Sequence, residues 1–210
     1  MATAVRTPLA PATRDRLERR ARLLAWGGNA WHVIEFAIAV GAGIAAGSVA
    51  LVAFGIDSLI EVAAGTVVIW LARGGRSGSA AAERRAQQLI AASFFALAAY
   101  VIADSARAFG GAHPDASWVG IGLALVTAPT MPLLARTKRR VGQQLGSRAV
   151  ESEGSQNMLC AYLSIALLVG LTANALLGWW WADPIAGLII AGVAVREGRE
   201  AWSGDTCDCC

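Results

Sequence analysis

Two carboxylates lie where a carboxylate is energetically costly, and their spacing predicts a cation site. Asp57 and Glu61 fall inside a 50-residue run, 23–72, that contains no Lys or Arg. Because they are four residues apart, they share one face of a helix. Burying a charge at membrane depth is unfavourable unless something compensates it, so an ionisable pair there marks a functional site. We predict that a divalent cation, or protons in its absence, compensates the pair; the alternative is a structural pair satisfied by neighbouring Ser, Thr or Arg.

A second polar pair precedes the first. His32 and Glu35 are three residues apart and share a helix face with Asn29. They either pair with each other or form a proton relay or a second stopping point for the metal.

Three thiols close the sequence. The chain ends Cys-Asp-Cys-Cys, with thiols at Cys207, Cys209 and Cys210. In a reducing cytoplasm they stay reduced. They either capture a soft metal and pass it to the membrane site, or belong to a solvated tail that binds metal only incidentally.

The composition predicts an all-α membrane protein. Hydrophobic residues make up 56% of the 210 residues and charged residues only 16%, against about 25% in a soluble domain. A helical span needs about 20 mostly apolar residues, and the sequence has room for six. We expect a cytoplasmic Arg-rich segment (1–22), a six-helix transmembrane domain (23–202) and a short Cys-rich cytoplasmic tail (203–210). The six expected spans are 23–46, 48–72, 86–109, 118–135, 147–179 and 183–202.

The basic residues predict the orientation. Seventeen of the 18 Lys and Arg fall before span one, after even-numbered spans or at the end of span six, including a predicted basic loop at 136–146. Short basic loops stay in the cytoplasm, so both termini are expected there. Topology and contact with anionic lipid account for the net charge of +3, and no nucleic acid partner is expected.

Spans two and five echo each other at an offset of 99 residues. Span two opens Ser-Val-Ala-Leu at Ser48, and span five opens Ser-Arg-Ala-Val at Ser147. Gln156 and Cys160 thereby occupy the positions of Asp57 and Glu61, and Ser58 aligns with Asn157. Each pair begins about 14 Å along its helix, near mid-bilayer. Repeats whose polar positions meet at the midplane are typical of transporters.

With these motifs the sequence resembles the cation diffusion facilitator family over roughly residues 20–202. The resemblance rests on Asp57-x-x-x-Glu61 and Gln156-x-x-x-Cys160, on the matching approaches to both motifs, and on Asp-Pro-Ile-Ala at 183–186. It implies six spans, cytoplasmic termini, a homodimer and a four-ligand metal site from spans two and five. The family's usual C-terminal cytoplasmic domain is not expected here.

The span-five motif departs from the family pattern. Gln156 is a weak neutral ligand and Cys160 a soft one, and Glu153, one turn earlier, is either a substitute carboxylate ligand or an acid lining the cytoplasmic mouth. Cys160 is alternatively a small buried core residue. A coordinating thiol favours Zn, Cd, Co or Fe(II) over Mg or Ca.

These residues predict a divalent transition-metal exporter of the bacterial plasma membrane, driven by protons and holding no resident cofactor. Metal moves outward as protons move inward. Two alternatives remain open: a proton-coupled exporter of organic cations with Glu35 as the exchanging acid, and a facilitator-like membrane partner that does not transport. An enzyme is not expected, because the sequence offers no nucleophile–base pair.

Overall fold

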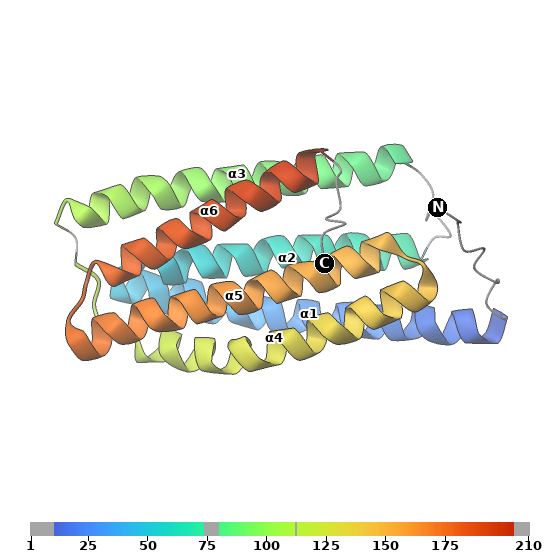
Figure 1. Ribbon diagram of the computed structural model, residues 1–210, viewed down its shortest axis with the longest axis horizontal. Coiled ribbons are helices and arrows are strands. Elements are labelled where there is room, and N and C mark those ends of the chain that lie inside the picture. Colours follow the sequence, from blue (N-terminus) through green and yellow to red (C-terminus); the bar gives the residue numbers. More distant parts are fainter. Residues whose placement is uncertain (1–10, 74–79, 112, 204–210) are drawn as a thin grey trace, which may run out of the picture.

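The computed structural model describes residues 11–73, 80–111 and 113–203, which form a bundle of six helices without strands (Figure 1). The helices are α1 (Pro11–Ala46), α2 (Val49–Arg73), α3 (Ala80–Phe109), α4 (Trp118–Leu145), α5 (Arg148–Leu177) and α6 (Ala182–Ser203). Each of the six expected spans corresponds to one helix. The predicted all-α membrane bundle is therefore confirmed.

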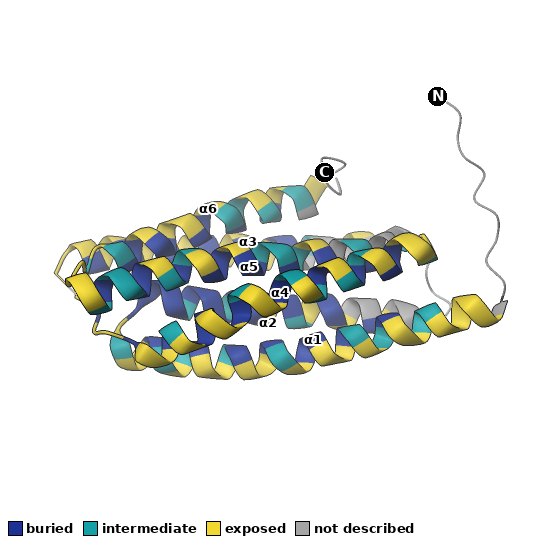
Figure 2. Cartoon of the chain, turned by 60° about the horizontal axis from the view of Figure 1, so that its bottom comes forward, coloured by how far each residue is buried: buried dark blue, intermediate teal, exposed yellow. Residues whose placement is uncertain are grey.

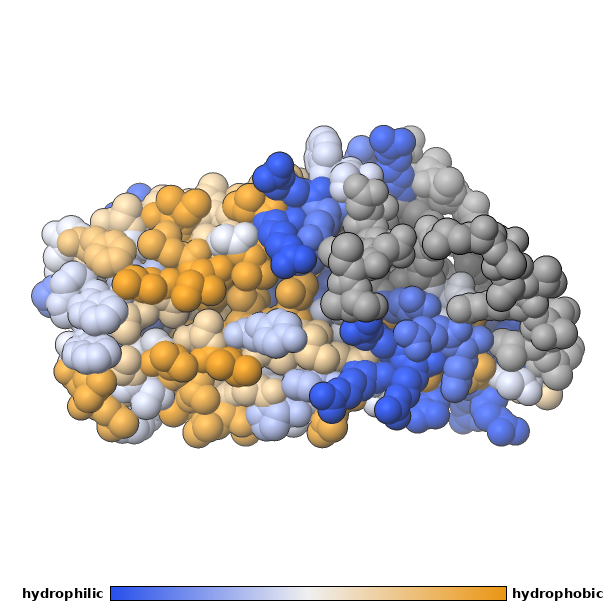
Figure 3. All heavy atoms as spheres, in the orientation of Figure 1, coloured by the Kyte–Doolittle hydropathy of each residue, from blue (hydrophilic) through white to orange (hydrophobic). Residues whose placement is uncertain are grey.

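Five of these helices, α1 to α5, contain a stretch long and apolar enough to cross a membrane. α6 has 22 residues, and it carries four charged side chains close to its end, at 196, 197, 199 and 200. It packs along α3, so it completes the bundle. In Figure 3 the exposed apolar surface covers one end and the middle of this face, while hydrophilic side chains gather towards the other end.

The helices pack mainly as three pairs, and α2 is central. α1 pairs with α2, α4 with α5, and α3 with α6, which is its neighbour in space but not in sequence (Figure 1). α2 contacts α1, α3, α5 and α6. About two thirds of its membrane stretch is inside the bundle, while α1 exposes much of its outer face (Figure 2). The acids at 57 and 61 are therefore carried by the most enclosed helix.

The prediction of a basic loop at 136–146 is wrong, because α4 continues to Leu145. It runs through Pro129 and Pro132 and ends only at Gly146, whose φ of 66° terminates the helix in the left-handed conformation. The residues that follow the prolines are mostly good helix formers, and a helix need not stop at the edge of the lipid. The run of basic residues therefore predicted a polar segment correctly but predicted the wrong backbone conformation for it.

Glycines let α4 and α5 approach closely. A Cβ added at Gly142 would lie 2.8 Å from the backbone nitrogen of Glu151, and one at Gly154 would lie 3.0 Å from the carbonyl oxygen of Ala135. Both contacts involve backbone, so neither is relieved by turning a side chain. Small residues at such positions are typical of helix pairs in membranes.

We expect Gly142→Ala to lower the free energy of unfolding by about 1–3 kcal/mol, because the added methyl group overpacks this contact. Gly122→Ala is the matched control on the same helix, since a Cβ there meets nothing within 4 Å. Alanine has the higher helix propensity, so the control is expected to be neutral or slightly stabilising. Denaturant titration in detergent measures both variants. Equal stability of the two variants would contradict the packing account.

Candidate metal centre

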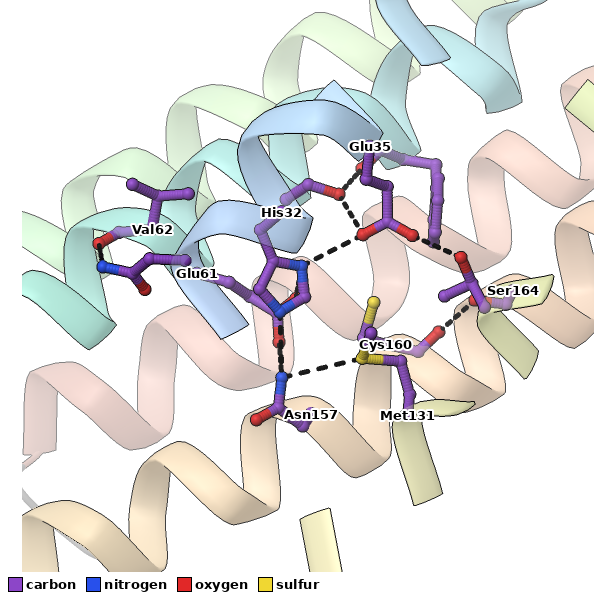
Figure 4. A network of polar contacts seen from close by, with 12 residues as sticks. His32, Glu35, Glu61, Val62, Met131, Asn157, Cys160 and Ser164 are labelled. Atoms are coloured by element: carbon purple, nitrogen blue, oxygen red, sulfur yellow. Dashed lines mark hydrogen bonds and ion pairs between the residues drawn. The ribbon is translucent and has the colours of Figure 1, made fainter. Parts of the chain in front are cut away.

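Two side chains of α1 point into the bundle and meet each other there. His32 and Glu35 are both buried, and His32 Nδ1 lies 3.0 Å from Glu35 Oε2 (Figure 4). Their neighbours Val33, Ile34 and Ile38 are exposed on the outer face of the same helix. One face of α1 is thus apolar towards the outside, and the opposite face carries a polar pair into the interior.

Glu61 from α2 and Cys160 from α5 join this pair. One ligating atom from each of His32, Glu35, Glu61 and Cys160 can be chosen so that all four atoms lie within 4.8 Å of one another. All four residues are buried. In a tetrahedral site with metal–ligand bonds of about 2.0–2.3 Å, ligand atoms are roughly 3.3–3.8 Å apart. These four residues, called the tetrad below, are thus about 1 Å from a closed coordination shell.

The hydrogen bonds around His32 indicate which ring nitrogen carries the proton. Asn157 Nδ2 lies 3.0 Å from His32 Nε2 and also faces Glu61 Oε1 at 3.5 Å and Met131 Sδ at 3.8 Å. A carboxylate and a thioether accept hydrogen bonds, so the amide presents its NH₂ group here. His32 Nε2 therefore accepts, and the proton of the neutral ring is on Nδ1.

That single proton faces two carboxylates. His32 Nδ1 is 3.0 Å from Glu35 Oε2 and 3.1 Å from Glu61 Oε2. Apart from this contact with the His32 ring, buried Glu61 Oε2 receives no hydrogen bond from the described residues. A buried carboxylate oxygen without a donor is costly. A further positive charge at Glu61 would therefore stabilise the centre.

Glu35 is held far more firmly than Glu61. The hydroxyl of Thr127 on α4 donates to Glu35 Oε1 at 2.5 Å, and the hydroxyl of Ser58 on α2 donates to Glu35 Oε2 at 2.9 Å. With His32, three helices orient this carboxylate. Sequence reasoning missed Thr127 and Asn157 as supporting residues. The 99-residue echo already aligned Asn157 with Ser58, and both prove to contact the tetrad.

The 99-residue repeat also accounts for which of the predicted α2 and α5 residues lie together. Glu61 and the equivalent Cys160 belong to the tetrad, whereas Asp57 and the equivalent Gln156 line an adjacent hollow. Glu61 lines that hollow as well, so it stands between the two groups. The structure thus brings together two of the four expected ligands with His32 and Glu35, and places the other two alongside.

Glu153 is engaged in an ion pair one turn before Asn157. Lys138 Nζ lies 2.6 Å from Glu153 Oε1, and the two side chains are 2% and 6% exposed. The lipid contact expected of the basic residues does not hold for Lys138: α4 turns this lysine inward, where Glu153 compensates its charge. A Cβ on Gly28 would lie 2.9 Å from Nζ, so glycine leaves room for the ammonium against α1.

Asn29 connects α1 to α2 at the same level, because its amide donates to Val62 O at 3.3 Å and to Thr66 Oγ1 at 3.2 Å. It lies outside the tetrad. The three terminal thiols lie outside the described residues; among the described cysteines, Cys160 is a free, buried thiol.

Comparison with known proteins identifies a family and a relative. The family pattern of the cation efflux transmembrane domain matches residues 31–203, which includes every residue of the tetrad. A protein of Paramagnetospirillum magneticum named MamV, described as a candidate transporter, is 34% identical over 86 residues. That alignment covers 40% of this chain and 25% of MamV, so the chain matches about a quarter of the length of this relative.

Proposed function

Because the chain belongs to the cation diffusion facilitator family, we propose that it exports divalent transition-metal ions through the tetrad. The observation that carries this proposal is the convergence of four ligand atoms from three helices to within 4.8 Å in the bundle interior. Few functions require an imidazole, a thiol and two carboxylates to lie together at one buried position. Binding a metal ion is the purpose that uses all four.

The donor set indicates the class of metal. A thiolate and an imidazole favour Zn, Cd, Co or Fe(II), whereas Mg and Ca prefer oxygen ligands only. Glu61 supplies a buried carboxylate oxygen that faces the His32 ring at 3.1 Å. Glu35 supplies a second carboxylate, already oriented by Thr127 and Ser58.

The metal and the Nδ1 proton compete for one position. Nδ1 is the ring nitrogen that faces both carboxylates, so it is the nitrogen that binds metal. The ring's single proton then moves to Nε2, so the imidazole stays neutral and the protons that are released come from the thiol and the carboxyl groups. Asn157 Oδ1, which has no partner among the described residues, can accept from Nε2–H once the amide turns over. Such a second contact fixes the ring of a metal-binding histidine.

This competition supports metal/proton antiport. Cys and carboxylate groups bind metal in their deprotonated forms, so loading the tetrad releases protons. Protons re-entering from the opposite side neutralise the empty carboxylates, which would otherwise be unpaired charges inside lipid. Metal therefore moves outward while protons move inward.

The arrangement of the bundle supports the expected orientation. The start of α1 and the end of α6 lie towards the same end, and hydrophilic side chains gather there (Figures 1 and 3). We assign this end to the cytoplasm of a bacterial cell, with the bundle in the plasma membrane, and infer a homodimer from the family resemblance. The organic-cation alternative is less well supported, because Glu35 is 0% exposed and bound by three neighbouring side chains.

Cys160→Ser is expected to change which metal is carried. In proteoliposomes with an imposed pH gradient, we expect uptake of Cd(II) to fall at least about tenfold relative to Mn(II), because serine replaces the soft ligand with a hard one. Ser155→Ala on the exposed face of α5 is the control and should leave the preference unchanged. An unaltered order of Zn, Cd, Co, Fe(II) and Mn in Cys160→Ser would argue against a ligand role for the thiol.

A further inference from the structure

A buried ion pair lies between the tetrad and the end of the bundle assigned to the cytoplasm. Lys138 on α4 and Glu153 on α5 are 2% and 6% exposed, and Lys138 Nζ is 2.6 Å from Glu153 Oε1. α5 begins at the cytoplasmic end (Figure 1). Glu153 precedes Asn157, the contact of His32, by four residues, so it lies about 6 Å closer to that end.

The remaining two helices of the tetrad, α1 and α2, close around this pair. A Cβ on Gly28 of α1 would lie 2.9 Å from Lys138 Nζ, and one on Gly65 of α2 would lie 3.1 Å from Glu153 Oε1. The Cβ on Gly65 would also collide with Asn29 Oδ1. The ion pair and Asn29 therefore fill the space between α1, α2, α4 and α5 at one level.

The opposite side of the tetrad is filled by apolar side chains. Phe54 lies seven residues before Glu61 on α2, and Leu167 lies seven residues after Cys160 on α5, so each shares a helix face with its tetrad residue. Both are 0% exposed and belong to the hydrophobic core. Apolar side chains thus separate the tetrad from the outer end, whereas charged ones separate it from the cytoplasm.

Stability alone does not account for the charges at the cytoplasmic level. A buried ion pair is often no more stabilising than apolar residues of similar size, because both ions lose their hydration. That same loss favours opening towards water, since separation returns hydration to the ammonium and the carboxylate. Separating two apolar side chains would instead expose apolar surface, which is unfavourable.

We propose that the Lys138–Glu153 ion pair is the cytoplasmic gate of the tetrad, closed in this structure and opened when its two ions separate. The inference rests on the proposed function, because it places the gate on the path by which metal reaches the tetrad. Opening leaves the Glu153 carboxylate facing the cytoplasm, where it attracts a divalent cation. Once Lys138 pairs with Glu153 again, the ammonium lies between the bound ion and the cytoplasm and opposes its return.

The rate at which Cys160 is modified from the cytoplasm measures how often the gate opens. The parent protein for this test has Cys207, Cys209 and Cys210 replaced by serine, so that Cys160 is the remaining thiol of the chain. Inside-out membrane vesicles expose the cytoplasmic side to a cationic, membrane-impermeant methanethiosulfonate. Intact-protein mass spectrometry follows the modification, and the measurement needs no bound metal.

Lys138→Met with Glu153→Leu is expected to slow the modification of Cys160 at least about tenfold, because two apolar side chains gain no hydration when they separate. The exchanged pair, Lys138→Glu with Glu153→Lys, is expected to react at close to the parent rate. Arg14→Met with Glu18→Leu is the control, because it removes an exposed ion pair near the start of α1. This control should leave the rate unchanged.

A rate in the apolar variant at or above that of the parent would overturn the gate, and so would an exchanged variant as slow as the apolar one. Cadmium binding separates this result from failure of the proposed function. The parent protein should show the ultraviolet thiolate-to-cadmium band when the tetrad binds Cd(II). Absence of that band, with the modification rates as expected, would defeat the proposed function and leave the gate standing.

Discussion

Replacing Glu61 by glutamine is expected to reduce metal transport about a hundredfold, which corresponds to roughly 3 kcal/mol. Glu61 carries a buried oxygen that faces the His32 ring, and it lies between the tetrad and the adjacent hollow lined by Asp57 and Gln156. Glutamine keeps the shape but removes the charge that is proposed to bind the ion in the tetrad. Zinc uptake by proteoliposomes under a pH gradient measures the effect.

Two further variants sharpen this prediction. Glu61→Asp keeps the charge and is expected to retain part of the activity. Asp104→Asn removes an acid that pairs with Arg107 on α3, away from the tetrad, and is expected to transport normally. Transport by Glu61→Gln at the level of Asp104→Asn would show that the ion does not pass Glu61.

Replacing Lys138 by methionine is expected to destabilise the bundle by about 3–5 kcal/mol, because Glu153 is left as a buried, unpaired charge. The ion pair is short, at 2.6 Å, and nearly completely enclosed. Denaturant titration in detergent measures the loss. Arg140→Met removes an exposed basic side chain two residues further along the same helix and is expected to change stability little.

The double replacement Lys138→Met with Glu153→Leu distinguishes the ion pair from simple packing. Removing both charges should restore most of the stability, since a buried pair replaced by apolar residues of similar size is often neutral. A double variant as unstable as Lys138→Met alone would mean that the lysine stem, and not the charge balance, holds α4 against α1 and α5.

The number and order of the helices were predictable from the sequence, since they depend on apolar runs long enough to cross a membrane. The end of α4 was not, because the nine residues from Thr137 to Leu145 are mostly polar, as in a loop, although no proline interrupts them. The inward turn of Lys138 was missed for the same reason. The direction of a lysine side chain in a loop cannot be inferred from the sequence, whereas in a helix it is set by the residue's position around the helix axis.

The site was predictable in part. The echo identified equivalent positions in α2 and α5, and the structure groups them as equivalents. The repeat could not show that Asp57 and Glu61, which lie about 40° apart around their helix, face different neighbouring residues. Nor could it show that α1 packs against α2 so that His32 and Glu35 meet Glu61, because one sequence does not state which helices are adjacent.

The most direct test of the tetrad is the coordination shell of a bound ion. X-ray absorption spectroscopy is applied to Cd(II) in the nanodisc-embedded protein whose three terminal cysteines are serine. We predict a shell with one sulfur and with nitrogen and oxygen neighbours, and loss of the sulfur on Cys160→Ser. A shell of oxygen alone in the parent protein, or a sulfur that persists without Cys160, would contradict the binding of metal by His32, Glu35, Glu61 and Cys160.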